Sequence, residues 1–124
     1  MESITSKWIK LMQIGHYCGC HQMPERSFFI HGYQFPLCAR CTGMLVGEII
    51  TFVLLSLKVL ISPILSIVFL GIMGIDWFIQ FIRLVYSTNV RRFITGIMGG
   101  IGMTTITVRF ILRIVNFIRC HYAE

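Results

Sequence analysis

The sequence predicts an all-α, multi-pass membrane protein with about three transmembrane helices and an N-terminal surface lobe rich in cysteine and histidine. The chain is 56% hydrophobic and only 13% charged, whereas a soluble domain carries about 25% charged residues. Long apolar runs fill the chain after residue 41, and four of the five cysteines lie before them. With 124 residues there is room for one domain. We expect an interfacial helix and lobe over residues 1–40 and the transmembrane helices over residues 41–118.

The N-terminal segment predicts a short helix followed by an ordered lobe. Apolar residues recur at helical spacing over residues 4–16 and include Trp8. This pattern fits a helix lying in the membrane interface and equally an amphipathic helix that packs on the rest of the protein. Residues 17–40 contain Pro24 and Pro36, which interrupt any long helix. Their many aromatic residues indicate an ordered lobe rather than a linker.

Three apolar runs predict the membrane helices. The first covers about residues 39–61, the second about 63–86 and the third about 90–118. Ser62 and Pro63 fit the start of the second helix, and Ser87, Thr88 and Asn89 are candidate caps for the third. About 20 residues span the hydrocarbon, so the third run is longer than needed. Its arginines are expected where the helix leaves the membrane. They are Arg109, Arg113 and Arg119.

The basic residues predict the orientation of the chain in the cell membrane. With three spans, the lobe and the second loop share one side and hold seven of the 11 basic residues, against four on the other side. The positive-inside rule therefore favours a cytoplasmic lobe. The formal net charge is +6. Because the basic residues lie beside the apolar runs, we expect them to anchor the helices at the membrane surface and not to bind nucleic acid. We expect no cleaved signal peptide, because the first apolar run begins only near Thr42.

Two pairs of glycines predict close helix packing. Gly43 and Gly47 form a GxxxG pattern in the first membrane helix, and Gly96 and Gly100 form another in the third. Small residues let membrane helices approach closely. We expect them to pack these helices together, with a homo-oligomer contact as the less favoured use.

The cysteine spacing predicts a metal site in the lobe. Cys38 and Cys41 are separated by two residues, a spacing at which both can bind one zinc ion. Cys20 is the expected third ligand and His21 the fourth, with Cys18, His16 and His31 as alternatives. A metal would stabilise a lobe too small to bury a sufficient core. Zinc is therefore the expected cofactor, in a structural role.

The same cysteines permit two other interpretations. Cys38 and Cys41 lie at the start of a helix, where N–H groups and Arg40 stabilise a thiolate. That environment is typical of a thiol–disulfide redox centre. The third interpretation is that these cysteines are small buried residues without chemistry.

Polar residues within the membrane helices indicate a second candidate site. Asp76, Gln80 and Arg83 share one helix face at spacings i, i+4 and i+7. Asp76 can pair with Arg83 or with a neighbouring helix, because charged residues within spans are costly unless paired or functional.

Arg91 and Arg92 follow a helix start, where they can bind a lipid phosphate or anchor the topology. The expected ligand-binding set is Arg40, Asp76, Gln80, Asn89 and Arg92. A purely structural network that locks the helices together is the alternative.

Three segments carry a resemblance to a known family. They are CHQMPERSFFIHGYQFPLCARCTGMLVG (residues 20–47), GIDWFIQ and STNVRRFITG. They resemble the small prokaryotic membrane proteins of the domain of unknown function 2085 family, over most of residues 20–100. The positions that match the family pattern are Cys20, His21, Gln22, Pro24, Arg26, Ser27, Phe28, Gln34, Cys38, Arg40, Cys41, Thr42, Gly43, Asp76, Gln80, Ser87, Asn89, Arg92 and Gly96. The resemblance implies a membrane protein and no particular activity.

The sequence thus favours a membrane protein whose metal-binding lobe lies over a polar intramembrane cleft. One alternative is a membrane enzyme, either a thiol redox enzyme or a transferase acting on a lipid phosphate. Another is an accessory subunit whose polar face meets another membrane protein. The lipid bilayer is the expected surrounding, and transport would require an oligomer because three spans are too few for a path within one chain.

Overall fold

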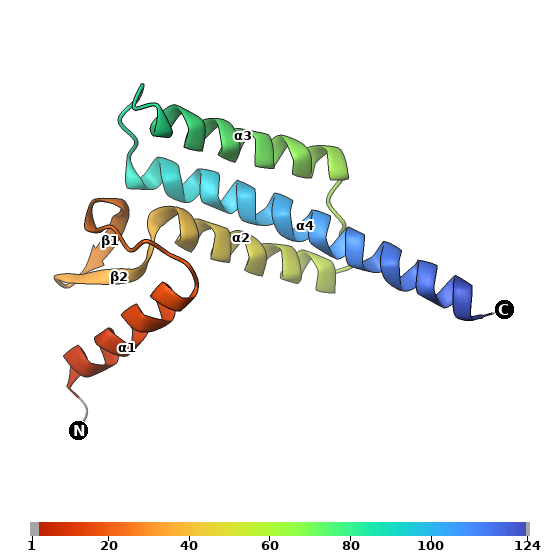
Figure 1. Ribbon diagram of the computed structural model, residues 1–124, viewed down its shortest axis with the longest axis horizontal. Coiled ribbons are helices and arrows are strands. Elements are labelled where there is room, and N and C mark those ends of the chain that lie inside the picture. The colour runs from red at the N-terminus through yellow and green to blue at the C-terminus, as the bar shows by residue number, and fades with distance from the viewer. Residues whose placement is uncertain (1–2, 124) are drawn as a thin grey trace.

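Three long helices lie side by side in the computed structural model, with a small lobe at one end (Figure 1). The structure describes residues 3–123, so residues 1, 2 and 124 of the expected domain lie outside the described part. The long helices are α2 (Ala39–Ser56), α3 (Pro63–Phe81) and α4 (Asn89–Tyr122). Each is long and apolar enough to cross a membrane, which agrees with the three expected spans.

Two of these helices end about five residues earlier than the apolar runs indicate. After α2 ends at Ser56, Lys58 has φ +60°, and after α3 ends at Phe81, Arg83 has φ +55°. In both cases the residue that follows the positive-φ residue donates its backbone N–H to the carbonyl five positions earlier. The distance is 2.9 Å after α2 and 3.2 Å after α3. This motif closes a helix and normally uses glycine at the positive-φ position. The sequence therefore carries no recognisable stop signal at either end.

The starts of the long helices are better encoded. α3 begins with Pro63, whose fixed φ suits the first helical position. The Thr88 hydroxyl accepts a hydrogen bond from the backbone N–H of Arg91 at 3.3 Å and caps α4. At the start of α2 the capping atom is a sulfur, because Cys38 Sγ accepts the N–H of Cys41 at 3.5 Å.

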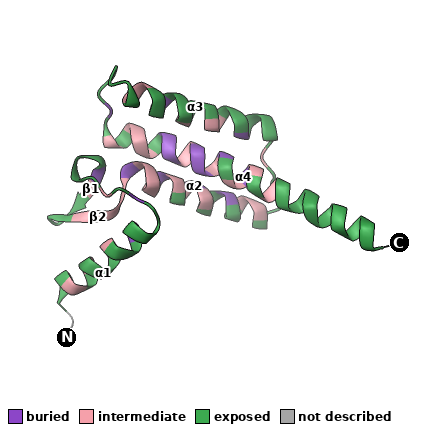
Figure 2. Ribbon diagram, viewed as in Figure 1, coloured by how far each residue is buried: buried purple, intermediate pink, exposed green. Residues whose placement is uncertain are grey.

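Glycines bring α2 and α4 into backbone contact. The four glycines of the two GxxxG patterns are all buried (Figure 2). A Cβ atom at Gly96 would contact the carbonyl oxygen of Arg40, and one at Gly100 would contact that of Met44. The expected packing role of these glycines within the chain is thereby confirmed.

α4 is the central helix of the bundle, with α3 on its other side (Figure 1). Ser66 of α3 is fully buried, and a Cβ atom at Gly102 would lie 2.6 Å from its carbonyl oxygen. Near the far end, Arg109 donates a 2.6 Å hydrogen bond from Nη2 to the carbonyl of Ile61, in the α2–α3 connection. From Phe110 onward α4 extends beyond its neighbours and is exposed (Figure 2).

The lobe contains a β-hairpin that the all-α expectation did not include. Its elements are α1 (Ile4–Tyr17), the 3₁₀ turn η1 (Pro24–Arg26), β1 (Ser27–Ile30) and β2 (Tyr33–Cys38). The antiparallel strands are joined by His31 and Gly32, with φ +49° and +82°. Positive φ at both turn residues is the geometry of a tight hairpin, in which Asn-Gly or Asp-Gly is usual.

Two glutamines and a tryptophan hold α1 against β2. The indole N–H of Trp8 donates to the carbonyl of Gln34 at 2.8 Å. The amide of Gln22 donates to the carbonyls of Met12 and Pro36, at 2.6 and 2.7 Å. The Gln34 amide returns a 2.7 Å bond to the carbonyl of Gln22. These contacts show that α1 packs on the rest of the lobe, and its expected position in the membrane interface stays a prediction.

The lobe is attached directly to the start of α4. Asn89 Nδ2 donates to the carbonyl of Ser27 at 3.1 Å. The rings of Phe28 and Phe93 pack edge to face with centroids 5.9 Å apart. These contacts fix the position of the hairpin above the membrane helices.

Candidate functional site

Three cysteine sulfurs come together where the lobe meets α2. The Sγ atoms of Cys20, Cys38 and Cys41 all lie within 4.8 Å of one another. Cys20 is almost completely buried, and the other two are partly buried. No disulfide joins them, since all three are free thiols.

The hairpin is what closes the 18-residue gap between Cys20 and Cys38. Strand β2 runs antiparallel to β1, with Ser27 opposite Cys38. The returning strand therefore ends beside the segment that follows α1, where the Cys38 N–H donates to Cys20 Sγ at 3.1 Å. Cys41 follows in the first turn of α2.

His21, expected as the fourth ligand, is not part of this cluster. Cys20 points into the lobe, whereas its neighbour His21 is exposed. The alternative ligands His16, Cys18 and His31 are exposed as well and also lie outside the cluster. The structure thus brings together three of the four expected metal ligands.

The thiol of Cys38 is strongly acidified. The hydrogen bond from the Cys41 thiol lowers the pKa of Cys38 to about 5, and this outweighs the opposing effect of burial. Backbone N–H groups of Cys41 and Arg40 act in the same direction. A thiolate is the form of cysteine that binds metals and attacks disulfides.

The cluster has the donor set of a soft-metal site. Zinc–sulfur bonds of about 2.3 Å in a tetrahedron separate the sulfurs by about 3.8 Å. Sulfurs within 4.8 Å of one another reach this spacing by small side-chain adjustments. The same proximity is compatible with thiol–disulfide exchange, because a disulfide needs two neighbouring cysteines.

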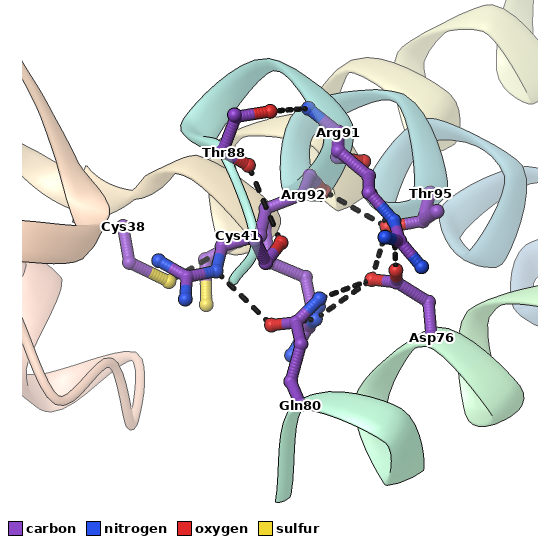
Figure 3. A network of polar contacts seen from close by, with 10 residues as sticks. Cys38, Cys41, Asp76, Gln80, Thr88, Arg91, Arg92 and Thr95 are labelled. Carbon is purple, nitrogen blue, oxygen red and sulfur yellow. Dashed lines mark hydrogen bonds and ion pairs between the residues drawn. The ribbon is translucent and has the colours of Figure 1, made fainter. Parts of the chain in front are cut away.

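A network of charged groups lies beside the sulfur cluster, with Asp76 at its centre (Figure 3). Asp76 is only 3% exposed. Its Oδ2 accepts from Arg40 Nη2 at 3.1 Å and from Thr95 Oγ1 at 3.2 Å. Its Oδ1 lies 2.6 Å from Arg91 Nε. One carboxylate thus joins α2, α3 and α4.

Gln80 extends this network by one helical turn. Its Nε2 donates to Asp76 Oδ2 at 2.6 Å. Its Oε1 accepts from Arg40 Nη2 at 3.0 Å and from Arg92 Nε at 3.1 Å. The amide therefore fixes two guanidinium groups and one carboxylate oxygen.

Four of the five expected ligand-binding residues meet in this network, namely Arg40, Asp76, Gln80 and Arg92. Asn89 does not, because it binds the lobe at Ser27. Asp76 pairs with the neighbouring helices and not with Arg83. Sequence reasoning missed Thr95 as a member and Arg91 as a partner of Asp76. Arg91 and Thr95 are spaced i, i+4 in α4, and this spacing was the only sequence signal that they share one face of the helix.

Arg40 connects the two sites. It lies between Cys38 and Cys41 in the sequence and binds both Asp76 and Gln80. Figure 3 shows Cys38 and Cys41 to one side of the network formed around Asp76 and Gln80. The sulfur cluster and the buried charges therefore share one residue, Arg40, at the start of α2.

This fold and site define a small multi-pass membrane protein with a three-cysteine lobe over a buried ion-pair network. The chain belongs to the family described as predicted membrane protein DUF2085, whose family model matches residues 20–106. That range includes the sulfur cluster and the polar network, and it excludes α1 and the end of α4. The resemblance seen in the sequence is thereby confirmed.

Two archaeal relatives are similar over most of their length. An uncharacterised protein of Methanothermobacter thermautotrophicus is 39% identical over 92 residues, which cover 71% of this chain and 83% of the relative. An uncharacterised protein of Methanocaldococcus jannaschii is 42% identical over 106 residues, covering 77% of this chain and 68% of the relative. No solved structure matches the chain.

Proposed function

We propose that this protein binds one zinc ion through Cys20, Cys38 and Cys41, and that the ion stabilises the lobe at the membrane surface. The observation that carries the proposal is the placement of three sulfurs within 4.8 Å of one another. They come from the segment after α1, the end of β2 and the first turn of α2. A metal bound there would join all three segments, as structural zinc sites do in small domains.

Charge supports the same assignment. Three thiolates around a divalent ion carry one net negative charge, which suits the position of Arg40 between two of the ligands. Zinc prefers four ligands. We propose His21 for the fourth position, since it adjoins Cys20 in the sequence and its side chain is exposed.

Elemental analysis of the full chain, purified in detergent without chelators, tests the proposal. We expect about one zinc per chain and loss of the metal in Cys38→Ser with Cys41→Ser. The matched control is Cys18→Ser with Cys120→Ser, because both of those thiols are exposed and outside the cluster. Retention of zinc in His21→Ala would assign the fourth position to another ligand.

The contrary result is also informative. A protein without metal, in which Cys38 and Cys41 cycle readily between thiol and disulfide, would reject the metal site. It would favour the thiol redox interpretation, which the low pKa of Cys38 supports.

We propose that the lobe faces the cytoplasm, as the seven basic residues on its side favour. Cys18 lies in the lobe, directly after α1, and Cys120 lies near the end of α4 that is farthest from the lobe (Figure 1). A membrane-impermeant maleimide added to intact cells should therefore label Cys120 and spare Cys18, with labelling located by mass spectrometry. Labelling of Cys18 in place of Cys120 would establish the reverse orientation.

A further inference from the structure

A polar cavity separate from the sulfur cluster opens between the lobe and the end of α3. Its volume is about 500 Å³, within the range of small-molecule sites. Three arginines line it, together with one acidic residue and an amide; these are Arg26, Arg83, Arg92, Glu25 and Gln80. The lining thus combines residues of η1, α3, α4 and the connection that follows α3.

The charges around this cavity do not balance. Its three arginines face a single carboxylate, that of Glu25. Arg40 and Arg91, which share Asp76, are not among the lining residues. The lining of the cavity therefore carries three guanidinium groups and one carboxylate, a surplus of two positive charges. A surplus of guanidinium groups favours a bound anion, because each guanidinium presents several N–H donors to it.

The cavity arginines have hydrogen-bond donors to spare. Arg92 uses Nε to bind Gln80, and its two terminal nitrogens make no hydrogen bond within residues 3–123. Over the same described range, the side chains of Arg26 and Arg83 form neither an ion pair nor a hydrogen bond. Guanidinium groups bind phosphate oxygens through paired N–H donors.

Arg83 lies in the connection that follows α3, at the positive-φ position that ends this helix, with φ +55°. It is one of the residues that line the cavity.

We propose that this cavity binds a phosphate group, carried by a phospholipid headgroup or by free phosphate, through Arg26, Arg83 and Arg92. The cavity lies at the end of the membrane helices where lipid headgroups are found. The fully exposed Tyr86 also lines it, and tyrosine is enriched at this level of a membrane. Arg40 and Asp76, expected from the sequence to contact such a ligand, do not line the cavity; both bind Gln80, which does.

Binding measurements on the full chain in detergent test this site with two probes. One is dihexanoyl phosphatidylglycerol and the other is inorganic phosphate, each titrated by calorimetry. We expect Arg26→Gln with Arg83→Gln to raise the Kd of the binding probe at least about tenfold. The matched control, Arg113→Gln with Arg119→Gln, removes two exposed arginines at the opposite end of α4 and should leave the Kd unchanged.

The two probes distinguish the source of the phosphate. Binding of the lipid alone assigns a headgroup site, whereas binding of inorganic phosphate assigns a site for free phosphate. Absence of binding by both probes, or an equal loss in the two double variants, would overturn the proposal. Zinc content measured on the same samples separates this result from failure of the metal site, because no cavity arginine belongs to the sulfur cluster.

Discussion

Replacing Gly96 with leucine should separate α2 from α4 and unfold the bundle at a much lower temperature. Any Cβ atom at this position contacts the carbonyl oxygen of Arg40, and backbone cannot move aside as a flexible side chain can. Overpacking typically costs about 1–3 kcal/mol, and a clash with backbone should exceed this. The measurement is the thermal unfolding midpoint in detergent, followed by the fluorescence of Trp8 and Trp77.

Gly71→Leu is the matched control for this prediction. Gly71 is exposed on α3, and a Cβ atom there has nothing within 4 Å. The same substitution should therefore leave the unfolding midpoint nearly unchanged. Equal midpoints for the two variants would show that the α2–α4 contact does not depend on glycine.

Replacing Asp76 with asparagine should destabilise the protein by about 3 kcal/mol, as removal of one partner from a buried ion pair typically does. Asparagine keeps the shape of the side chain and removes the charge that Arg40 and Arg91 share. Glu48→Gln is the matched control, because Glu48 also lies in a membrane helix and forms no ion pair within the described residues. The free energy of unfolding in a denaturing detergent titration is the quantity to compare.

A double-mutant cycle with Arg40→Gln identifies the origin of this loss. Once the Arg40 charge is absent, Asp76→Asn should cost at least about 1 kcal/mol less, because residues in one network are not independent. Strictly additive losses would mean that Asp76 and Arg40 are not coupled, and would leave Arg91 as the charged partner of Asp76.

The membrane helices were predictable because their signal is compositional. Long apolar runs separated by Ser62-Pro63 and by residues 87–89 place all three spans, and the GxxxG patterns identify the surfaces that meet. The helix ends were less predictable. Lys58 and Arg83 adopt positive φ where the sequence shows neither glycine nor asparagine.

The lobe and the site were predictable only in part. Cys20, Cys38 and Cys41 were identifiable from spacing, but the hairpin that joins them turns at His31-Gly32, a weak turn signal. The role of Asn89 depends on the position of that hairpin, so it could not be inferred. Asp76 was recognisable as costly in a membrane, yet its partners Arg40 and Arg91 depend on how separate helices are arranged.

The central position of α4 has a consequence for biosynthesis. α2 and α3 leave the ribosome first, but each packs mainly on α4, which is made last. Until α4 inserts, Asp76 lacks Arg91 and Thr95, and the Ser27 carbonyl lacks Asn89. The glycine faces of α2 likewise have no partner to contact. Assembly of the bundle is therefore a late, post-insertion event. A chain that stops before residue 89 holds α2 and α3 but lacks α4, the helix on which both of them pack.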